Sequence, residues 1–345
     1  MVRLTAYFIG VLLQLLPILD YTKHNSAKIT AGERVVFEEL TELPSVEGAP
    51  NPGLAGAFAG KVGEKLIVAG GANFPDIDGP KVYQRDLYVY SGGAWMVYED
   101  FLPEGIAYGA SVALKDGLLC VGGCNDEKCF ADVFMIRFVN GEPRITNWNP
   151  LWYPLANAAY AVMDNKLYLA GGIHSVKNQQ SVAGFYVLDL KTRHCEILDA
   201  WPGESRAFGV GVSQGGCFYL FSGRTVDCDN WTGLDDGFKY NPQSGEWTPL
   251  GGGFEVMAGL AVPFGNNRIL FLGGRDVNNK NDRMLRLYNT YTEEIALIDV
   301  PDRVDIPVTS TIVKGDKAGE YIAVSGEVAP RIRTPKLLKV KISNR

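Results

Sequence analysis

Six apolar segments that end in a Gly-Gly or Ser-Gly pair constrain this 345-residue chain more than any other feature. The first copy reads Leu66-Ile67-Val68-Ala69-Gly70-Gly71, and similar segments follow at regular distances. The last glycines of the six copies are Gly71, Gly123, Gly172, Gly223, Gly274 and Gly326. The intervals between them are therefore 52, 49, 51, 51 and 52 residues. A fixed period of this length predicts that one structural unit is repeated six times.

Each unit contains the signals of four short strands. A small, glycine-rich segment such as Ala55–Gly60 or Ala107–Val112 comes first, and a polar turn and the apolar segment follow. A third segment alternates aromatic residues, as in Asp86–Tyr90, and a fourth often starts near a tryptophan, at Trp95, Trp148 and Trp247. Four strands per unit of about 50 residues resemble the kelch repeat. We therefore predict an all-β chain folded as a six-bladed kelch-type β-propeller, in which neighbouring blades cover each other's faces.

The last unit predicts how the ring closes. Its strands are expected at Val308–Val313, Tyr321–Val324 and Leu337–Ile342, and no fourth strand follows them. The segment Val35–Leu40 precedes the first unit and has no partner there. We expect it to form the outer strand of the last blade, because a free arm would leave sheet edges open. Residues 35–345 are then one propeller domain.

The N-terminal segment resembles a secretory signal. Met1-Val2-Arg3 is followed by a mostly apolar run from Leu4 to Leu19, which is too short and interrupted for a membrane span. The best cleavage position is near Ser26-Ala27, so residues 1–27 are predicted to be a leader. We then expect a periplasmic or secreted protein, or a cytoplasmic one if the segment is not a signal.

Charge and cysteine content narrow the function classes. The formal net charge is -6 and the isoelectric point is near 5.3, which argues against binding to nucleic acid. The six cysteines match no zinc or iron–sulfur spacing. Cys124 and Cys129 flank a short loop, and both a disulfide in an exported protein and two buried free thiols fit this arrangement.

Three stretches resemble the sialic acid mutarotase family, the N-acetylneuraminate epimerases. They are Gly56–Gly60 together with Leu66–Phe74, Ala107–Ser111, and Gly326–Thr334, which reads GEVAPRIRT. The last one is close to the family pattern G-E-x-x-P-x-x-R-T. In well-known bacterial members this pattern lies in the middle of the chain, whereas here it lies near the C-terminus. The chain thus resembles a cyclically permuted branch of the family, and a closed ring tolerates such a permutation.

The resemblance implies an isomerase that interconverts the α and β anomers of N-acetylneuraminate by acid–base ring opening, without a metal or an organic cofactor. It assigns catalytic roles to Glu327, as general base and acid, and to Arg333, which would contact the substrate carboxylate. The expected partner is a small sugar acid. Neither nucleic acid nor a membrane, apart from export, is an expected partner.

Position within the repeat suggests further substrate-binding residues. The loops after the second strands should open on one face of the ring, and polar side chains stand there in several units. The candidates chosen on this basis are Asn73, His174, Arg224 and Arg275, with Arg206 added from the start of an inner strand. Several arginines and one glutamate around a cavity would suit an anionic sugar.

Other readings remain open. An epimerase or binding propeller for another acidic or amino sugar fits the same residues, and a non-catalytic kelch interaction module fits the fold. A copper oxidase of the galactose oxidase type needs two histidine ligands along with tyrosines, whereas the chain has only His24, His174 and His194. The S-x-D-x-G-x-T-W boxes of sialidases are missing.

Overall fold

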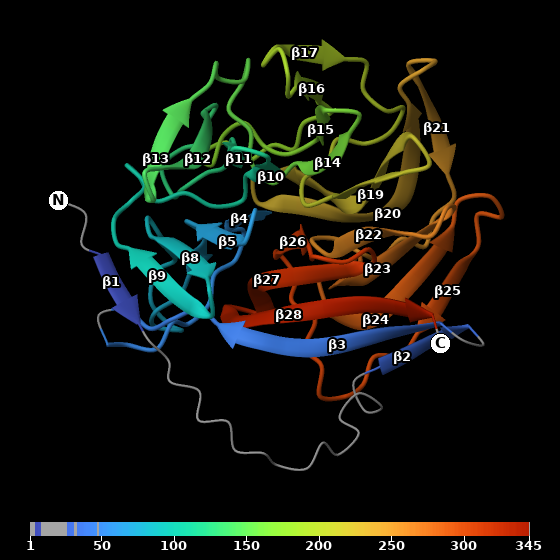
Figure 1. The fold of residues 1–345 in the computed structure, drawn as a ribbon. Coiled ribbons are helices and arrows are strands. Elements are labelled where there is room, and N and C mark those ends of the chain that lie inside the picture. Colours follow the sequence, from blue (N-terminus) through green and yellow to red (C-terminus); the bar gives the residue numbers. More distant parts are fainter. Residues whose placement is uncertain (1–3, 8–25, 31–32, 47, 345) are drawn as a thin grey trace.

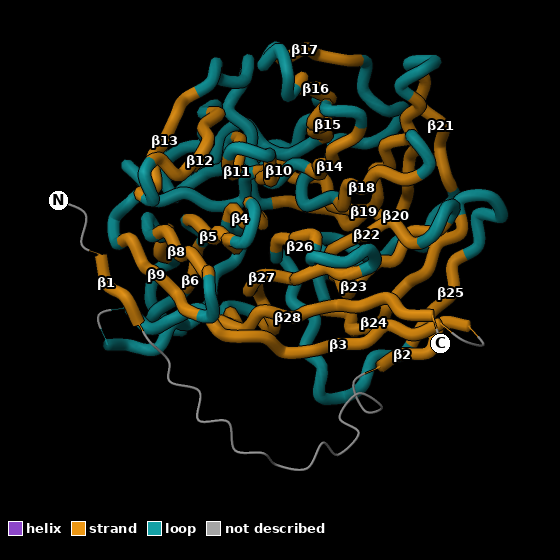
Figure 2. The backbone as a smooth tube through the Cα atoms, viewed as in Figure 1, coloured by secondary structure: helices purple, strands orange, loops and turns teal. Residues whose placement is uncertain are grey.

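The computed structural model describes residues 4–7, 26–30, 33–46 and 48–344. Its regular elements are strands, arranged as six antiparallel sheets around a central axis (Figure 1). Strands and loops alternate throughout the described part, which contains no helix and hence none that could cross a membrane (Figure 2). The predicted all-β, six-bladed propeller is confirmed.

The first three blades follow the predicted order of strands from the axis outward. Blade 1 consists of β4 (Phe58–Val62), β5 (Lys65–Ala69), β8 (Leu87–Ser91), β9 (Ala94–Tyr98) and β1 (Leu4–Tyr7). Blade 2 consists of β10 (Ala110–Leu114), β11 (Gly117–Val121), β12 (Val133–Val139) and β13 (Glu142–Asn147). Blade 3 consists of β14 (Ala159–Met163), β15 (Lys166–Ala170), β16 (Phe185–Asp189) and β17 (Cys195–Leu198). The short strands β6 (Ala72–Asn73) and β7 (Val82–Tyr83) pair separately beside blade 1.

The other three blades have longer middle strands. Blade 4 consists of β18 (Val210–Gln214), β19 (Cys217–Asp227), β20 (Asn230–Asn241) and β21 (Glu246–Leu250). Blade 5 consists of β22 (Leu260–Phe264), β23 (Arg268–Arg275), β24 (Asn281–Asn289) and β25 (Ile295–Ile298). Blade 6 consists of β26 (Thr311–Lys314), β27 (Glu320–Ala329), β28 (Ile332–Asn344), β3 (Glu33–Glu42) and β2 (Ser26–Thr30).

The N-terminal strand closes the last blade, as predicted. The blue strand β3 lies beside the red strand β28 in Figure 1 and pairs with it antiparallel, with Phe37 opposite Val340. Val35 and Phe37 are buried in the core between blades 5 and 6. Most of the predicted leader, including residues 8–25, lies outside the described residues, so export stays a prediction. Of that segment, Leu4–Tyr7 pairs with β9 as an additional outer strand of blade 1.

A ring of backbone hydrogen bonds around the axis also closes the propeller, and the N-terminal strand takes no part in it. The residue two positions before each inner strand donates its backbone N–H to the carbonyl of the equivalent residue in the preceding blade, at 2.7–2.9 Å. All six adopt φ between 49° and 62°, the left-handed region. They are Gly56, Tyr108, Asn157, Phe208, Ala258 and Thr309. We call these six residues the axial ring; its hydrogen bonds connect every blade to the next, including blade 6 to blade 1.

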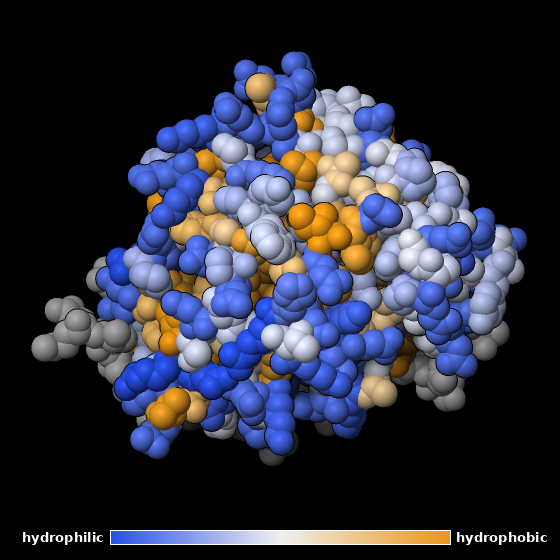
Figure 3. Space-filling model, turned by 90° about the horizontal axis from the view of Figure 1, so that it is seen from above, coloured by the Kyte–Doolittle hydropathy of each residue, from blue (hydrophilic) through white to orange (hydrophobic). Residues whose placement is uncertain are grey.

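The core lies between adjacent blades rather than in one central mass. Every residue of β11 is buried, and one face of each middle strand packs against the neighbouring blade. Blades 4 and 5 meet through aromatic rings such as Phe221 and Phe271, whose centroids lie 4.9 Å apart. Seen from the top edge of Figure 1, the outside of the ring is largely hydrophilic with scattered apolar patches (Figure 3).

Small residues on the inner strands let the blades approach the axis closely. A Cβ added to Gly211 on β18 would lie 2.6 Å from the backbone nitrogen of Tyr160 on the neighbouring β14. Gly251, by contrast, has open space around the same position and no positive φ. We expect Gly211→Ala to lower the free energy of unfolding by about 1–3 kcal/mol, because the backbone of β14 must move. Gly251→Ala is expected to change it by less than about 0.5 kcal/mol. Urea unfolding of both variants checks this, and equal effects would contradict the steric explanation.

Candidate active site

A cavity of about 320 Å³ opens at one end of the ring, above the axial ring. Five axial-ring residues, from Tyr108 to Thr309, contribute to its floor. The charged side chains that line it are Lys81, Asp126, Arg224, Arg275, Glu327 and Arg333. Four cations therefore face two carboxylates, an excess of two positive charges in a chain whose net charge is -6. This local excess favours an anionic ligand.

One position of the repeat supplies much of the cavity wall. The residue directly after each glycine pair forms an antiparallel bridge with the residue that precedes the axial ring. In blades 1 to 6 this position holds Ala72, Cys124, Ile173, Arg224, Arg275 and Glu327. At this position the residues are thus apolar or weakly polar in blades 1–3 and charged in blades 4–6.

In the charged half the strand continues past the glycine pair, whereas in blades 1–3 it ends before that pair. In β19, β23 and β27 the strand register shifts next to Gly223, Gly274 and Gly326, and the strand then continues along the cavity. Such bulges re-aim the side chains that follow them. Arg224, Arg275 and Glu327 each come directly after a bulge, so these side chains reach the cavity from extended, hydrogen-bonded strands.

Glu327 is the central group of this charged half. It is only 7% exposed, and its two carboxylate oxygens form separate ion pairs, Oε1 with Arg275 and Oε2 with Arg333. Both of its backbone groups are hydrogen-bonded to Val308. Two arginines therefore hold the carboxylate in place, and each oxygen keeps a lone pair that can accept a proton or a hydrogen bond.

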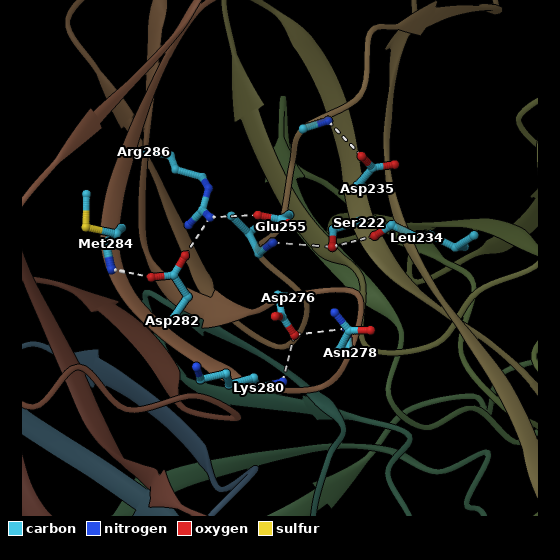
Figure 4. Close-up of polar contacts among 12 residues, drawn as sticks. Ser222, Leu234, Asp235, Glu255, Asp276, Asn278, Lys280, Asp282, Met284 and Arg286 are labelled. Atoms are coloured by element: carbon cyan, nitrogen blue, oxygen red, sulfur yellow. Dashed lines mark hydrogen bonds and ion pairs between the residues drawn. The ribbon is translucent and has the colours of Figure 1, made fainter.

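Arg275 is itself held by a tight turn. Its Nε donates to Asn281 Oδ1 at 3.0 Å, and its Nη1 donates to Asn279 Oδ1 at 3.1 Å. The turn is stabilised by Asp276, whose carboxylate accepts the backbone N–H groups of Asn278 and Lys280 at 2.9 and 2.8 Å (Figure 4). Arg275 thus uses three nitrogens on protein groups and serves to orient Glu327.

Arg333 connects Glu327 to blade 1. Its guanidinium lies 4.8 Å from the ring centroid of Phe74, and its positive charge opposes the rise in the pKa of the nearby Tyr108 hydroxyl. Burial raises the pKa of Tyr108 to about 12, so this hydroxyl stays protonated at neutral pH. Arg331 lies 4.0 Å from the same phenyl ring and donates to the carbonyls of Ile77 and Gly79, which fastens the loop after β6 to blade 6.

Arg224 differs from the other arginines of the cavity. Its guanidinium stacks on Phe208 and Trp231, at 4.6 and 5.4 Å, and its buried Nε has no hydrogen-bond partner. No carboxylate of the described residues forms an ion pair with it. Burial and the nearby Arg275 cation lower the pKa of Arg224. A half-buried cation without a counter-ion is a site that is prepared for an anion.

Three predicted residues do not line the cavity. Arg206 is fully buried, and its guanidinium binds both carboxylate oxygens of Asp236, at 2.7 and 3.1 Å. Asn73 is buried and accepts a hydrogen bond from Gln84 at 2.9 Å. His174 lies 3.1 Å from the hydroxyl of Tyr186 and stacks on Tyr153, and its partial burial lowers its pKa.

A shift of one residue explains Asn73 and His174. They stand one residue after the bridging position, which Ala72 and Ile173 occupy. Successive side chains of an extended segment point to opposite sides. A residue one position beyond the bridging residue therefore points away from the side that the bridging residue faces. Arg206 has another reason: it precedes Ala207, the residue that bridges Arg224, and its side chain enters the space between blades.

The sequence analysis missed several cavity residues. Tyr108 and Asn157 belong to the axial ring, and an alignment of the six units at this position would have found them. Lys81 lies in an irregular loop outside the repeat, and its ammonium lies 5.4 Å from the ring centroid of Tyr108. Desolvation over the neighbouring rings, followed by the Arg333 cation, lowers the pKa of Lys81.

Comparisons with known proteins agree with the resemblance. Residues 17–145 match the family model of N-acetylneuraminate epimerase. This part of the chain is similar to N-acetylneuraminate epimerases. Residues 154–198 match the kelch motif, which fits the confirmed propeller. The matched epimerase segment carries Lys81, Tyr108 and Cys124, whereas Glu327 and Arg333 lie outside it.

Individual relatives carry the same name. The N-acetylneuraminate epimerase of Brucella melitensis is 38% identical over 117 residues, which is 30% of either chain. That of Vibrio vulnificus is 34% identical over 128 residues, 33% of either chain. That of Vibrio cholerae is 42% identical over 101 residues, 25% of this chain and 26% of its own. The matches thus span about a third or less of the length of these curated relatives.

Proposed function

We propose that this protein is an isomerase that interconverts the α and β anomers of N-acetylneuraminate by opening and closing the sugar ring. The observation that carries the proposal is the buried Glu327 carboxylate, which two arginines hold at the wall of a cavity with an excess of positive charge. The names of the relatives support the substrate, since they are N-acetylneuraminate epimerases.

The reaction needs one base and one acid near the anomeric carbon. Glu327 takes the proton of the anomeric hydroxyl. The electron pair of that O–H bond then forms the carbonyl, while the bond between the anomeric carbon and the ring oxygen breaks. The ring oxygen accepts a proton from Lys81 or from the Tyr108 hydroxyl, the two groups near Glu327 that can donate one. Rotation of the open keto acid and closure by the reverse steps give the other anomer, and each group recovers its proton state.

Arg224 is the natural receptor of the substrate carboxylate. Arg275 and Arg333 already share the Glu327 carboxylate as their ion partner, whereas Arg224 stacks on two aromatic rings and forms no ion pair with a carboxylate of the described residues. A carboxylate placed on Arg224 would also lie on the charged side of the cavity. The apolar lining from Ile173, Val176 and Met257 is then available for the uncharged parts of the sugar, such as an N-acetyl methyl group.

Arg224→Met is expected to weaken binding of the sugar acid roughly 10- to 150-fold, because a charge-assisted hydrogen bond is worth about 1.5–3 kcal/mol. The methyl ester of the same sugar, which lacks the negative charge, should bind both proteins equally. Arg193→Met is the matched control, since Arg193 also stacks on a ring, Trp148 at 4.8 Å, but outside the cavity. Calorimetric titration measures these affinities, and an equal loss for acid and ester would contradict the assignment.

Proton NMR of freshly released α-N-acetylneuraminate tests the activity itself. The protein should speed relaxation to the equilibrium mixture without changing the final ratio of anomers. A rate equal to that in buffer would overturn the proposal for this sugar. Screening other acidic and amino sugars would then distinguish a different epimerase from a binding propeller.

A further inference from the structure

Cys124 and Cys129 face each other across the two arms of a tight turn. They form an isolated antiparallel bridge, and the flanking hydrogen bonds run from Asn125 N to Lys128 O at 3.0 Å and from Phe130 N to Gly123 O at 2.8 Å. The cysteines are therefore a non-hydrogen-bonded pair, for which the Cα atoms lie about 4.5 Å apart. This separation lies within the range of about 4.4–6.8 Å that a disulfide spans.

The turn between the cysteines is fixed by its own side chain. Asn125 Oδ1 accepts the backbone N–H groups of Glu127 and Lys128 at 2.9 and 3.0 Å. The two sulfur atoms are consequently held opposite each other before any bond forms. Both thiols are free in the structure, and each one changes the pKa of the other.

The surroundings of the pair favour thiolate chemistry on one of the two sulfurs. The facing Cys124 thiol lowers the pKa of Cys129, and Cys129 together with burial raises the pKa of Cys124. The Lys81 cation also stabilises a negative charge at Cys124. Cys124 lines the cavity, and Cys129 beside it is 7% exposed. Cys120 offers a contrast, because complete burial raises its pKa well above the ordinary value and it has no facing thiol.

We propose that Cys124 and Cys129 form a reversible dithiol–disulfide site in the wall of the cavity, oxidised by a low-molecular-weight disulfide such as glutathione disulfide. The Cys129 thiolate attacks one glutathione sulfur and releases a glutathione thiolate. Cys124 then loses its proton, attacks the Cys129 sulfur and releases the second glutathione. Two electrons and two protons pass from the protein to the glutathione disulfide, which becomes two thiols. This site does not depend on the proposed isomerase activity.

Trypsin offers a direct readout, because Lys128 lies between the two cysteines. Cleavage yields the peptides Asp116–Lys128, which carries Cys124, and Cys129–Arg137. Reduced protein is equilibrated in glutathione buffers of increasing oxidised fraction, quenched in acid, alkylated with N-ethylmaleimide, digested and analysed by mass spectrometry. We expect the two peptides to become linked in most of the protein, with a loss of two hydrogen atoms, and dithiothreitol to separate them.

Two variants and one internal control make the result decisive. Cys124→Ser and Cys129→Ser should each abolish the linked peptides, and the first also excludes a bond from Cys120 on the same peptide. The exposed Cys228 should form a mixed disulfide with glutathione in the same samples, which shows that the oxidant was active. If Cys228 is modified while Cys124 and Cys129 remain fully alkylated, the proposal is wrong.

Discussion

Replacing Glu327 by glutamine is expected to slow protein-catalysed exchange of the N-acetylneuraminate anomers roughly 100- to 10,000-fold, the usual contribution of a positioned general base. Glutamine keeps the shape of the side chain but cannot accept the proton of the anomeric hydroxyl. It also removes the negative charge between Arg275 and Arg333, so an anionic sugar should bind at least as tightly. The loss should therefore appear in the rate at saturating sugar and not in KM, which time-resolved NMR at several sugar concentrations measures.

Glu39→Gln is the matched control for this experiment. Glu39 pairs with Lys336 at 3.0 Å on the exposed edge of blade 6, far from the cavity lining. Exposed pairs contribute about 0–1 kcal/mol, so both stability and rate should stay close to those of the unmodified protein. Full activity in Glu327→Gln would show that the base is another group. Weaker binding at an unchanged saturated rate would make Glu327 a binding residue only.

Phe221→Ala is expected to lower the free energy of unfolding by about 3–5 kcal/mol. Phe221 is completely buried between blades 4 and 5, with the ring centroids of Phe254 and Phe271 at 4.6 and 4.9 Å. Truncation leaves a cavity that these strands cannot fill, because both blades are fixed by the axial ring. Urea unfolding followed by tryptophan fluorescence measures the loss.

Tyr291→Ala provides the comparison for Phe221→Ala. Tyr291 is 80% exposed on an outer turn of blade 5, so its removal should change stability by less than about 0.5 kcal/mol. A loss below about 1 kcal/mol for Phe221→Ala would mean that the interface between these blades can collapse around the gap. The inter-blade core would then contribute less to closure than the hydrogen bonds of the axial ring.

The sequence alone determined the architecture of this protein. The period of the glycine pairs predicted six blades, and the lack of a fourth strand after Leu337–Ile342 predicted that Val35–Leu40 would close the ring. These features could be predicted from the sequence because every blade has the same two requirements. Apolar strands must be covered on both faces, and every sheet edge needs a partner.

The cavity was only partly predictable. Glu327, Arg333, Arg224 and Arg275 were selected from the motif and the repeat, and the tertiary structure brings all four together. Asn73 and His174 were selected by the same reasoning but stand one residue beyond the bridging position, because the sequence does not show which residue after the glycine pair forms the bridge. A side chain's direction depends on strand register, and register is decided by pairing with a distant segment.

Only the tertiary structure decided which charged side chains form ion pairs. Arg206 and Arg224 look alike as loop arginines, yet Asp236 neutralises the first between blades, while the second faces the cavity without a counter-ion. Lys81 and Tyr108 reach Glu327 and Arg333 only because blade 6 closes against blade 1, across more than 200 residues of chain. The repeat specifies local strands, but which side chains meet at the axis follows from closure of the ring.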